Sequence, residues 1–147
     1  MPPIVSTIEI ARPPEEVFAY VTDPSRFPEW QRDVVSVHLE GASAPRVGSR
    51  FATTRRITGA ERITNQEITE IDAPRSWAAR GVDGPIRPHA TVTVEPLDGG
   101  ARSRVTFALD FEGHGIGRPL VPAIRRQAQK VAPTSYRRLK ERLERGG

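Results

Sequence analysis

The chain has 147 residues, a formal net charge of +4 and no cysteine. Apolar residues make up 37% of it and charged residues 27%, which is typical of a globular domain and excludes a disordered chain or a membrane-spanning one. Without cysteine, disulfides, thiolate metal sites and a cysteine nucleophile are excluded. We expect one cytoplasmic domain over residues 1–147, with no secretion signal.

The first forty residues predict a strand, two short helices and a second strand. Residues 4–11 alternate in hydrophobicity and are rich in β-branched side chains, which is typical of a strand. Prolines and carboxylates at 13–16 mark a helix start, and this helix ends at Asp23-Pro24. A second helical segment is expected over 24–30, where Pro28 keeps it short. Residues 34–40 then alternate again.

Five more strands are expected before Gly113, separated by short turns. Because strand follows strand directly, the sheet must be largely antiparallel. Asp98-Gly99-Gly100 is a strong hairpin signal between the last two strands. The expected strands cover residues 50–58, 62–71, 76–82 and 89–97 and the run that ends at Gly113.

Three of these strands carry side chains whose direction matters for function. In the strand at 34–40, Val35, Val37 and Leu39 are expected on one face and His38 on the exposed face. The strand at 62–71 presents polar residues on either face unless it twists or bulges. Thr53 and Arg55 share the face of Phe51 in the same way, as the alternation of the strand at 50–58 requires. Polar groups directed inward favour a solvated or ligand-filled cavity over a sealed core.

The C-terminal segment changes to helical periodicity. It predicts one amphipathic helix of about 25 residues that starts near Pro119 or Pro122, with a kink near Pro133. Residues 115–147 carry a net charge of +7 and the rest of the chain −3. We expect the cations to fill the solvated face opposite the apolar stripe. That stripe consists of Ile116, Leu120, Ile124, Ala128, Val131, Leu139 and Leu143.

Few residues in the sequence are suited to catalysis. Among three histidines, His89 is the best acid–base candidate by elimination, although a hydrogen-bonded histidine at a strand edge would have the same context. His114 lies in a loop where exposure is expected, and His38 is expected to be exposed. The sequence has no Gly-x-Ser-x-Gly motif and no glycine-rich phosphate loop, and we expect no metal site.

The order of these elements and several local motifs resemble the START-like (SRPBCC) superfamily, which has the helix-grip fold of the birch-pollen-allergen type. Its bacterial branch is described as polyketide cyclase/dehydrase and lipid-transport-like. The resemblance covers residues 4–143. Its motifs are Ile8-Glu9-Ile10 leading into Pro13-Pro14-Glu15-Glu16-Val17-Phe18, Asp23-Pro24, Pro28-Glu29-Trp30, Gly48-Ser49-Arg50-Phe51, Asp72-Ala73-Pro74 before Ser76-Trp77, and Leu139-Lys140-Glu141-Arg142-Leu143-Glu144.

The resemblance implies an α+β fold, in which a curved antiparallel sheet of about seven strands surrounds a long C-terminal helix. It also implies a cavity between sheet and helix that binds a small hydrophobic ligand such as a lipid, a polyketide or another aromatic or isoprenoid molecule, without a cofactor. Taken with the apolar pattern, it gives an expected set of ligand-binding residues: Trp30, Phe51, Thr53, Trp77, His89, Phe107, Leu109, Phe111, Leu120, Ile124 and Ala128.

Two alternatives stay open beside a ligand carrier. One is a cyclase, aromatase or dehydratase acting on a polyketide-like substrate, in which His89, or Tyr136 if it faces inward, moves a proton. The other is an adaptor that binds a partner through the basic helix. For this basic face we expect no nucleic-acid binding, because it carries a single aromatic residue, Tyr136, and at most a transient contact with an anionic membrane surface. The chain is expected to be a monomer or a homodimer.

Overall fold

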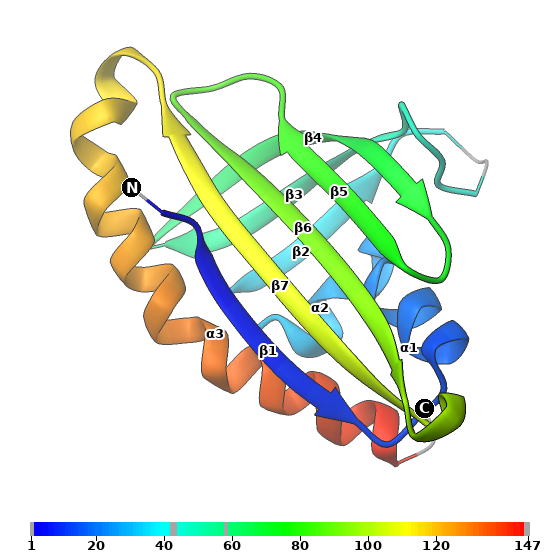
Figure 1. Cartoon of the computed structure of the whole chain (residues 1–147). Coiled ribbons are helices and arrows are strands. Elements are labelled where there is room, and N and C mark those ends of the chain that lie inside the picture. Colours follow the sequence, from blue (N-terminus) through cyan, green and yellow to red (C-terminus); the bar gives the residue numbers. More distant parts are fainter. Residues whose placement is uncertain (1, 42–43, 58, 146–147) are drawn as a thin grey trace.

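A computed structural model describes residues 2–41, 44–57 and 59–145 of the chain (Figure 1). Its centre is a seven-stranded sheet with the order β1-β7-β6-β5-β4-β3-β2, in which every neighbouring pair is antiparallel. The α+β helix-grip architecture expected from the sequence is therefore confirmed. The strands are β1 (Ile4–Ile10), β2 (Val34–Leu39), β3 (Arg50–Ile57), β4 (Ala60–Asp72), β5 (Ser76–Gly81), β6 (Ile86–Leu97) and β7 (Arg102–Gly113).

Strand boundaries lie close to those expected, and β6 shows the largest difference. It begins three residues earlier than predicted, so that Pro88 lies inside it. Proline has no N–H to donate, but β5 pairs with β6 only from His89 onward, and at Pro88 only β7 is paired with it. In the β6–β7 ladder the His114 N–H donates to the Pro85 carbonyl, so the Pro88–Phe111 pair, three positions on, is a non-hydrogen-bonded one, and the missing donor costs no ladder bond. The predicted end of β3 at Thr58 lies outside the described residues.

A bulge in β2 overturns the prediction for Val35. Val34 pairs with Arg55 and Ser36 with Thr54, so that Val35 is the extra residue. The bulge reverses the alternation, with the result that Val34 is buried and Val35 is 48% exposed. Val37 and Leu39 face the core as expected, and His38 is exposed.

A second irregularity, in β4, resolves the ambiguity of that strand. The register shifts between Ile68 and Glu70, so the inward face changes along the strand. Before the shift, Gln66 and Ile68 are buried and Ile63 is 71% exposed; after it, Ile71 packs against the core. The first half of β4 consequently directs polar side chains inward.

Helical segments cover one face of the sheet and one of its ends (Figure 1). The short helices pack buried side chains such as Val17, Phe27 and Trp30 into the core. The long helix α3 lies along the same face of the sheet and closes the fold. These segments are α1 (Pro14–Val21), η1 (Pro24–Arg26), α2 (Phe27–Trp30), η2 (Asp98–Gly100), η3 (Gly115–Leu120) and α3 (Val121–Glu144). None of the helices in the described ranges is long and apolar enough to cross a membrane.

The C-terminal half of α3 is firmly attached to the rest of the fold. Leu139 and Leu143 are 0% and 2% exposed, and burying each contributes about 1.5–3 kcal/mol. Arg142 donates to the Tyr20 hydroxyl at 2.8 Å and pairs with Glu29 at 3.2 Å. Burial and the neighbouring Glu29 carboxylate raise the pKa of Tyr20, which therefore stays a neutral member of this cluster.

The N-terminal half of α3 is held at its first turn. Arg125 was expected on the solvated face but is 8% exposed: its Nη1 lies 2.8 Å from Asp110 Oδ1 and its Nη2 donates to the Pro2 carbonyl at 2.6 Å. Two residues expected on the apolar stripe, Ile116 and Leu120, are 81% and 37% exposed. They belong to the 3₁₀ segment η3, whose three-residue turn does not continue the stripe of α3.

Pro133 lies inside α3, which continues through it to Glu144. The kink near Pro133 stays a prediction.

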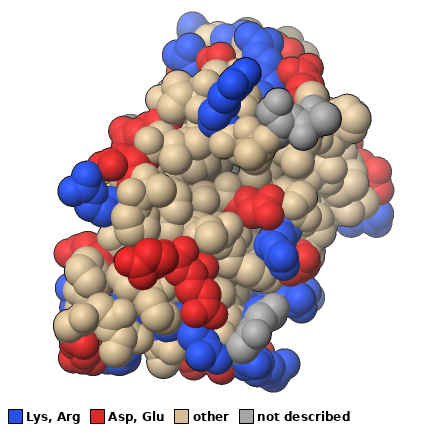
Figure 2. Space-filling view, turned by 90° about the vertical axis from the view of Figure 1, so that its right-hand side faces the viewer, with Lys and Arg blue, Asp and Glu red and all other residues tan. Residues whose placement is uncertain are grey.

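On the face of the molecule that Figure 2 shows, basic and acidic side chains are interspersed and neither sign dominates.

The segment η3 packs against the β5–β6 loop through a glycine. A Cβ built on Gly117 would lie 2.0 Å from the Pro85 carbonyl oxygen, well inside contact distance. We predict that Gly117→Ala lowers the free energy of unfolding by about 1–3 kcal/mol, because the two backbones must separate. Urea unfolding measures the change. Gly115→Asn is the control, since Gly115 has a φ of 57° and open space around it, and asparagine tolerates that conformation. Equal stability of Gly117→Ala and wild type would contradict this close packing.

Candidate functional site

A cavity of about 210 Å³ lies between the sheet and α3. It exists because the helix presents small side chains where it passes over the strands: Ala128, Ala132 and Ser135 all line it. Ala90 of β6 lines the opposite side. At the end formed by Asp83–Pro85, which are exposed residues, the cavity reaches the surface, and we call this end the mouth.

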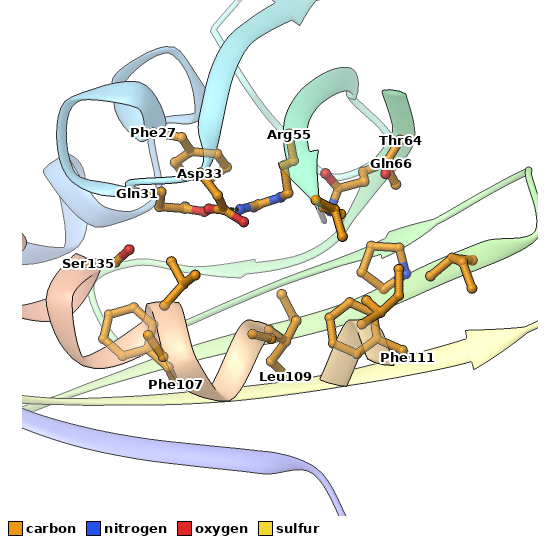
Figure 3. Close-up of a pocket in the computed structure, with 18 of the residues that line it drawn as sticks. Phe27, Gln31, Asp33, Arg55, Thr64, Gln66, Phe107, Leu109, Phe111 and Ser135 are labelled. Atoms are coloured by element: carbon orange, nitrogen blue, oxygen red, sulfur yellow. Dashed lines mark hydrogen bonds and ion pairs between the residues drawn. The ribbon is translucent and has the colours of Figure 1, made fainter. Parts of the chain in front are cut away.

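One side of the cavity is apolar. Alternate residues of β7 (Phe107, Leu109 and Phe111) line it, and Figure 3 shows these three side chains in a row along the strand. Ile124 and Val131 of α3 complete this apolar wall. It can bury the hydrocarbon or aromatic part of a ligand, which is the main source of affinity in sites of this kind.

The side facing β7 carries polar groups (Figure 3). Arg55 of β3 donates to Asp33 at 3.0 Å and to Gln31 at 2.6 Å, which ties the strand to the loop after α2. Deeper in the fold, Gln66 accepts a hydrogen bond from the fully buried Thr53 hydroxyl at 3.0 Å. We call the side chains of Gln31, Asp33, Arg55, Arg62, Thr64 and Gln66 the polar wall.

Among the residues that the structure describes, three nitrogen donors of the cavity lining are buried without a hydrogen-bond partner. They are the indole nitrogens of Trp30 and Trp77, whose side chains are 3% and 4% exposed, and Nε of Arg62. A buried donor without an acceptor costs about 1–3 kcal/mol, and such groups are rare in folded proteins. Each of these nitrogens lacks an acceptor, which a ligand oxygen within hydrogen-bond distance would supply.

Tyr136 of α3 also lines the cavity. Its ring stacks on Phe107 with centroids 4.1 Å apart and an angle of 11° between the planes. Burial raises the pKa of Tyr136 to about 12, with the Arg55 charge lowering it and the Asp33 charge raising it by smaller amounts. The phenol is therefore neutral at physiological pH and can donate a proton or a hydrogen bond.

The structure brings many of the residues expected at the site around one cavity. Those that line it are Trp30, Trp77, Phe107, Leu109, Phe111, Ile124 and Ala128.

Four expected residues lie elsewhere. Phe51 and Thr53 are fully buried in the core beside the cavity and do not line it. Leu120 lies in η3, outside the lining. His89 occupies the outer face of β6, because its neighbours Pro88 and Ala90 face the cavity, and its ring is 51% exposed. It is therefore not placed to move a proton inside the cavity.

His89 and His114 both lie near the carboxylate of Glu112. Glu112 lies 3.7 Å from His89 Nε2 and 2.7 Å from His114 Nε2. His114, at the start of η3, is partly exposed rather than fully so, and its Nε2 is buried. Within the described ranges, no three histidine, aspartate or glutamate side chains come together as a set that could hold a metal ion.

Sequence reasoning missed most of the polar wall. The inward direction of Arg55 follows from its alternation with Phe51, and that of Arg62 and Thr64 becomes readable once the bulge in β4 is known. Gln31 and Asp33 lie in an irregular segment after α2, where no periodicity signals direction.

Several solved structures have a similar fold. A START superfamily protein from Mycobacterium smegmatis superposes with a TM-score of 0.78 at 16% identity, over 99% of both chains. An aromatase/cyclase from Streptomyces sp. R1128 gives a TM-score of 0.78 at 12% identity, over 97% of this chain and 93% of that one. The di-domain aromatase/cyclase BexL of the BE-7585A biosynthetic pathway gives 0.73 at 20% identity.

This chain is covered to 98% in the BexL match but spans only 47% of BexL, about one of its two domains. These identities establish a shared fold. No protein in a search of curated sequences matches the chain. The family model described as "Polyketide cyclase / dehydrase and lipid transport" matches residues 1–144. The chain therefore belongs to the polyketide cyclase/dehydrase and lipid transport family.

Proposed function

We propose that the protein binds a small hydrophobic molecule, lipid-like or polyketide-like, in the cavity beneath α3. The observation that carries this proposal is a space with one apolar wall and, among its lining residues, buried donors that have no acceptor in the described part of the chain. A core that served stability alone would fill the space and pair the donors. The family description, which includes lipid transport, supports the same class of ligand.

The size and polarity of the cavity narrow the ligand. Its volume of about 210 Å³ lies below the roughly 300–1,000 Å³ of sites that enclose drug-sized molecules, so a larger ligand would extend through the mouth or displace α3. The indole donors of Trp30 and Trp77 favour a molecule that carries carbonyl, hydroxyl or carboxylate oxygens.

A second candidate function is catalysis on such a molecule, favoured by the position of Tyr136. The hydroxyl of Tyr136 holds its proton, lies within the electrostatic influence of Arg55 and Asp33, and belongs to a residue that lines the cavity. In a cyclisation or dehydration it would act as the acid, protonating a carbonyl or leaving oxygen. Two structural relatives are named as aromatase/cyclases.

The basic face of α3 is a further candidate for transient contact with an anionic membrane surface. Arg126, Lys130 and Arg137 are exposed. Within residues 2–41, 44–57 and 59–145 none of these three side chains makes an ion pair, so their charge is available to an outside partner.

Filling the cavity should abolish ligand binding. We predict that wild-type protein shows a lipid-sized adduct in native mass spectrometry and a raised melting temperature with members of a panel of lipids and aromatic polyketides. Ala128→Phe should remove both effects, because its ring occupies the ligand's space. Ala123→Phe is the matched control on the same helix, since Ala123 is exposed and outside the lining. No adduct and no thermal shift in the wild type would refute the proposal.

The protonation of Tyr136 should be visible in stability at alkaline pH. With a folded pKa of about 12 and an unfolded pKa near 10, the unfolded state loses its proton first, so the contribution of Tyr136 to stability is complete below pH 10 and falls above it. By pH 11 wild type should lose about 1.4 kcal/mol more than Tyr136→Phe, relative to pH 8. Urea unfolding of both proteins measures this difference. Parallel pH profiles would show that burial does not raise the pKa of Tyr136.

Neutralising the basic face should weaken membrane contact. We expect the triple variant Arg126→Gln, Lys130→Gln, Arg137→Gln to bind phosphatidylserine vesicles at least tenfold more weakly than wild type at low salt, at about 1 kcal/mol per cation. Vesicle co-sedimentation measures it, with phosphatidylcholine vesicles as the control. If wild type does not bind phosphatidylserine vesicles, the membrane contact is wrong.

A further inference from the structure

Two arginines lie directly opposite each other on the polar wall. Arg55 of β3 and Arg62 of β4 are paired in register, and both line the cavity. Like charges in this arrangement repel each other, and a guanidinium does not lose its proton at any physiological pH. The pair therefore needs negative charge nearby.

Only one of the two charges is compensated by the described residues. Arg55 has Asp33 at 3.0 Å and Gln31 at 2.6 Å. Arg62 makes no ion pair and no side-chain hydrogen bond within the described ranges, and its Nε is buried. The cavity thus contains a cation whose counter-charge the described residues do not supply.

The acid nearest to the mouth is already engaged. Asp83 lines the cavity, but its two carboxylate oxygens each lie 3.2 Å from Asn65 Nδ2 on the outer face of β4. No ion pair joins Asp83 to Arg62 in the described structure. The described residues therefore leave the Arg62 charge available to an anionic group of a ligand.

We propose that the ligand is an amphipathic carboxylic acid whose carboxylate binds Arg62 while its apolar part lies along the β7 wall. Arginine presents its N–H groups as a planar fork that matches the two oxygens of a carboxylate. The row of Phe107, Leu109 and Phe111 on the facing strand receives the hydrocarbon or aromatic part (Figure 3). This inference rests on the proposed function, because it names the class of ligand for the same cavity.

Acid–ester pairs provide the test. The fluorescent probes are cis-parinaric acid and 1-pyrenebutyric acid, one a chain and one an aromatic acid, each compared with its methyl ester below its aggregation concentration. Wild type should bind at least one acid about 10- to 100-fold more tightly than its ester, the range expected for a charge-assisted hydrogen bond. The probe that shows the preference distinguishes a fatty acid from an aromatic acid.

Three variants test whether Arg62 is the residue that binds the carboxylate. Arg62→Gln should remove the preference for the acid, because it lowers the affinity for the acid much more than the affinity for the ester. Arg62→Lys should retain part of it, since the charge stays and the fork is lost. Arg56→Gln is the matched control. Arg56 follows Arg55 in β3, but its side chain lies on the opposite, exposed face of the strand and pairs with Glu61. It should keep the full preference. Circular dichroism checks folding, and if Arg62→Gln does not fold, Arg62→Lys decides alone.

The outcomes separate the two proposals. Equal affinity of wild type for acid and ester would overturn the carboxylate inference and leave hydrophobic binding in place. A preference for the acid that stays at the wild-type level in the Arg62 variants that fold would overturn the assignment to Arg62. If neither acid nor ester binds wild type, hydrophobic binding fails, and the carboxylate inference fails with it.

Discussion

The structure depends on how helix α3 is fixed. The helix is anchored to the rest of the fold at both ends, and between these anchors it covers the cavity. At the C-terminal end, Leu139 and Leu143 are buried and Arg142 joins the Tyr20–Glu29 cluster. At the other end, Arg125 holds the first turn to Asp110. Between these anchors the helix presents small residues to the sheet. Because the backbone cannot approach further without breaking an anchor, the space stays open.

This constraint explains why the fold tolerates polar side chains facing inward. A sealed core with Arg55 and Arg62 on its wall would be strongly unstable, since unpaired buried charges cost several kcal/mol. Here the pairing of Arg55 with Asp33 and the opening at the mouth lower that cost. The bulge in β4 then returns Ile71 to the core on the other side of the shift. The bulge thus lets one strand direct polar side chains into the cavity before the shift and an apolar side chain into the core after it.

Sequence periodicity predicted the strands, the helix order and the apolar wall, because alternation in β7 and the three-to-four spacing in α3 determine which side chains share a face. It failed where one residue changes the register. The bulges moved Val35 outward and turned Arg62 and Thr64 inward, and nothing in local composition marks a bulge. His89 was ranked first because histidines are scarce, an argument that contains no information about direction. Arg125 was assigned to solvent by its charge, whereas its ion pair with Asp110 of β7 holds it against the sheet.

Several contacts that fix α3 use main-chain carbonyl groups as acceptors. Arg125 donates to the carbonyl of Pro2, Arg138 to that of Glu29 and Lys140 to that of Glu9. Every residue type provides a carbonyl, so these three hydrogen bonds do not depend on the side chain of the acceptor residue. The helix's own cations thus supply one part of its attachment, beside the buried Leu139 and Leu143 and the Arg12 side chain, which donates to the carbonyls at the end of the helix. A fold held in part through main-chain acceptors depends on fewer specific side chains, and the structural relatives reported above share it at 12–20% identity.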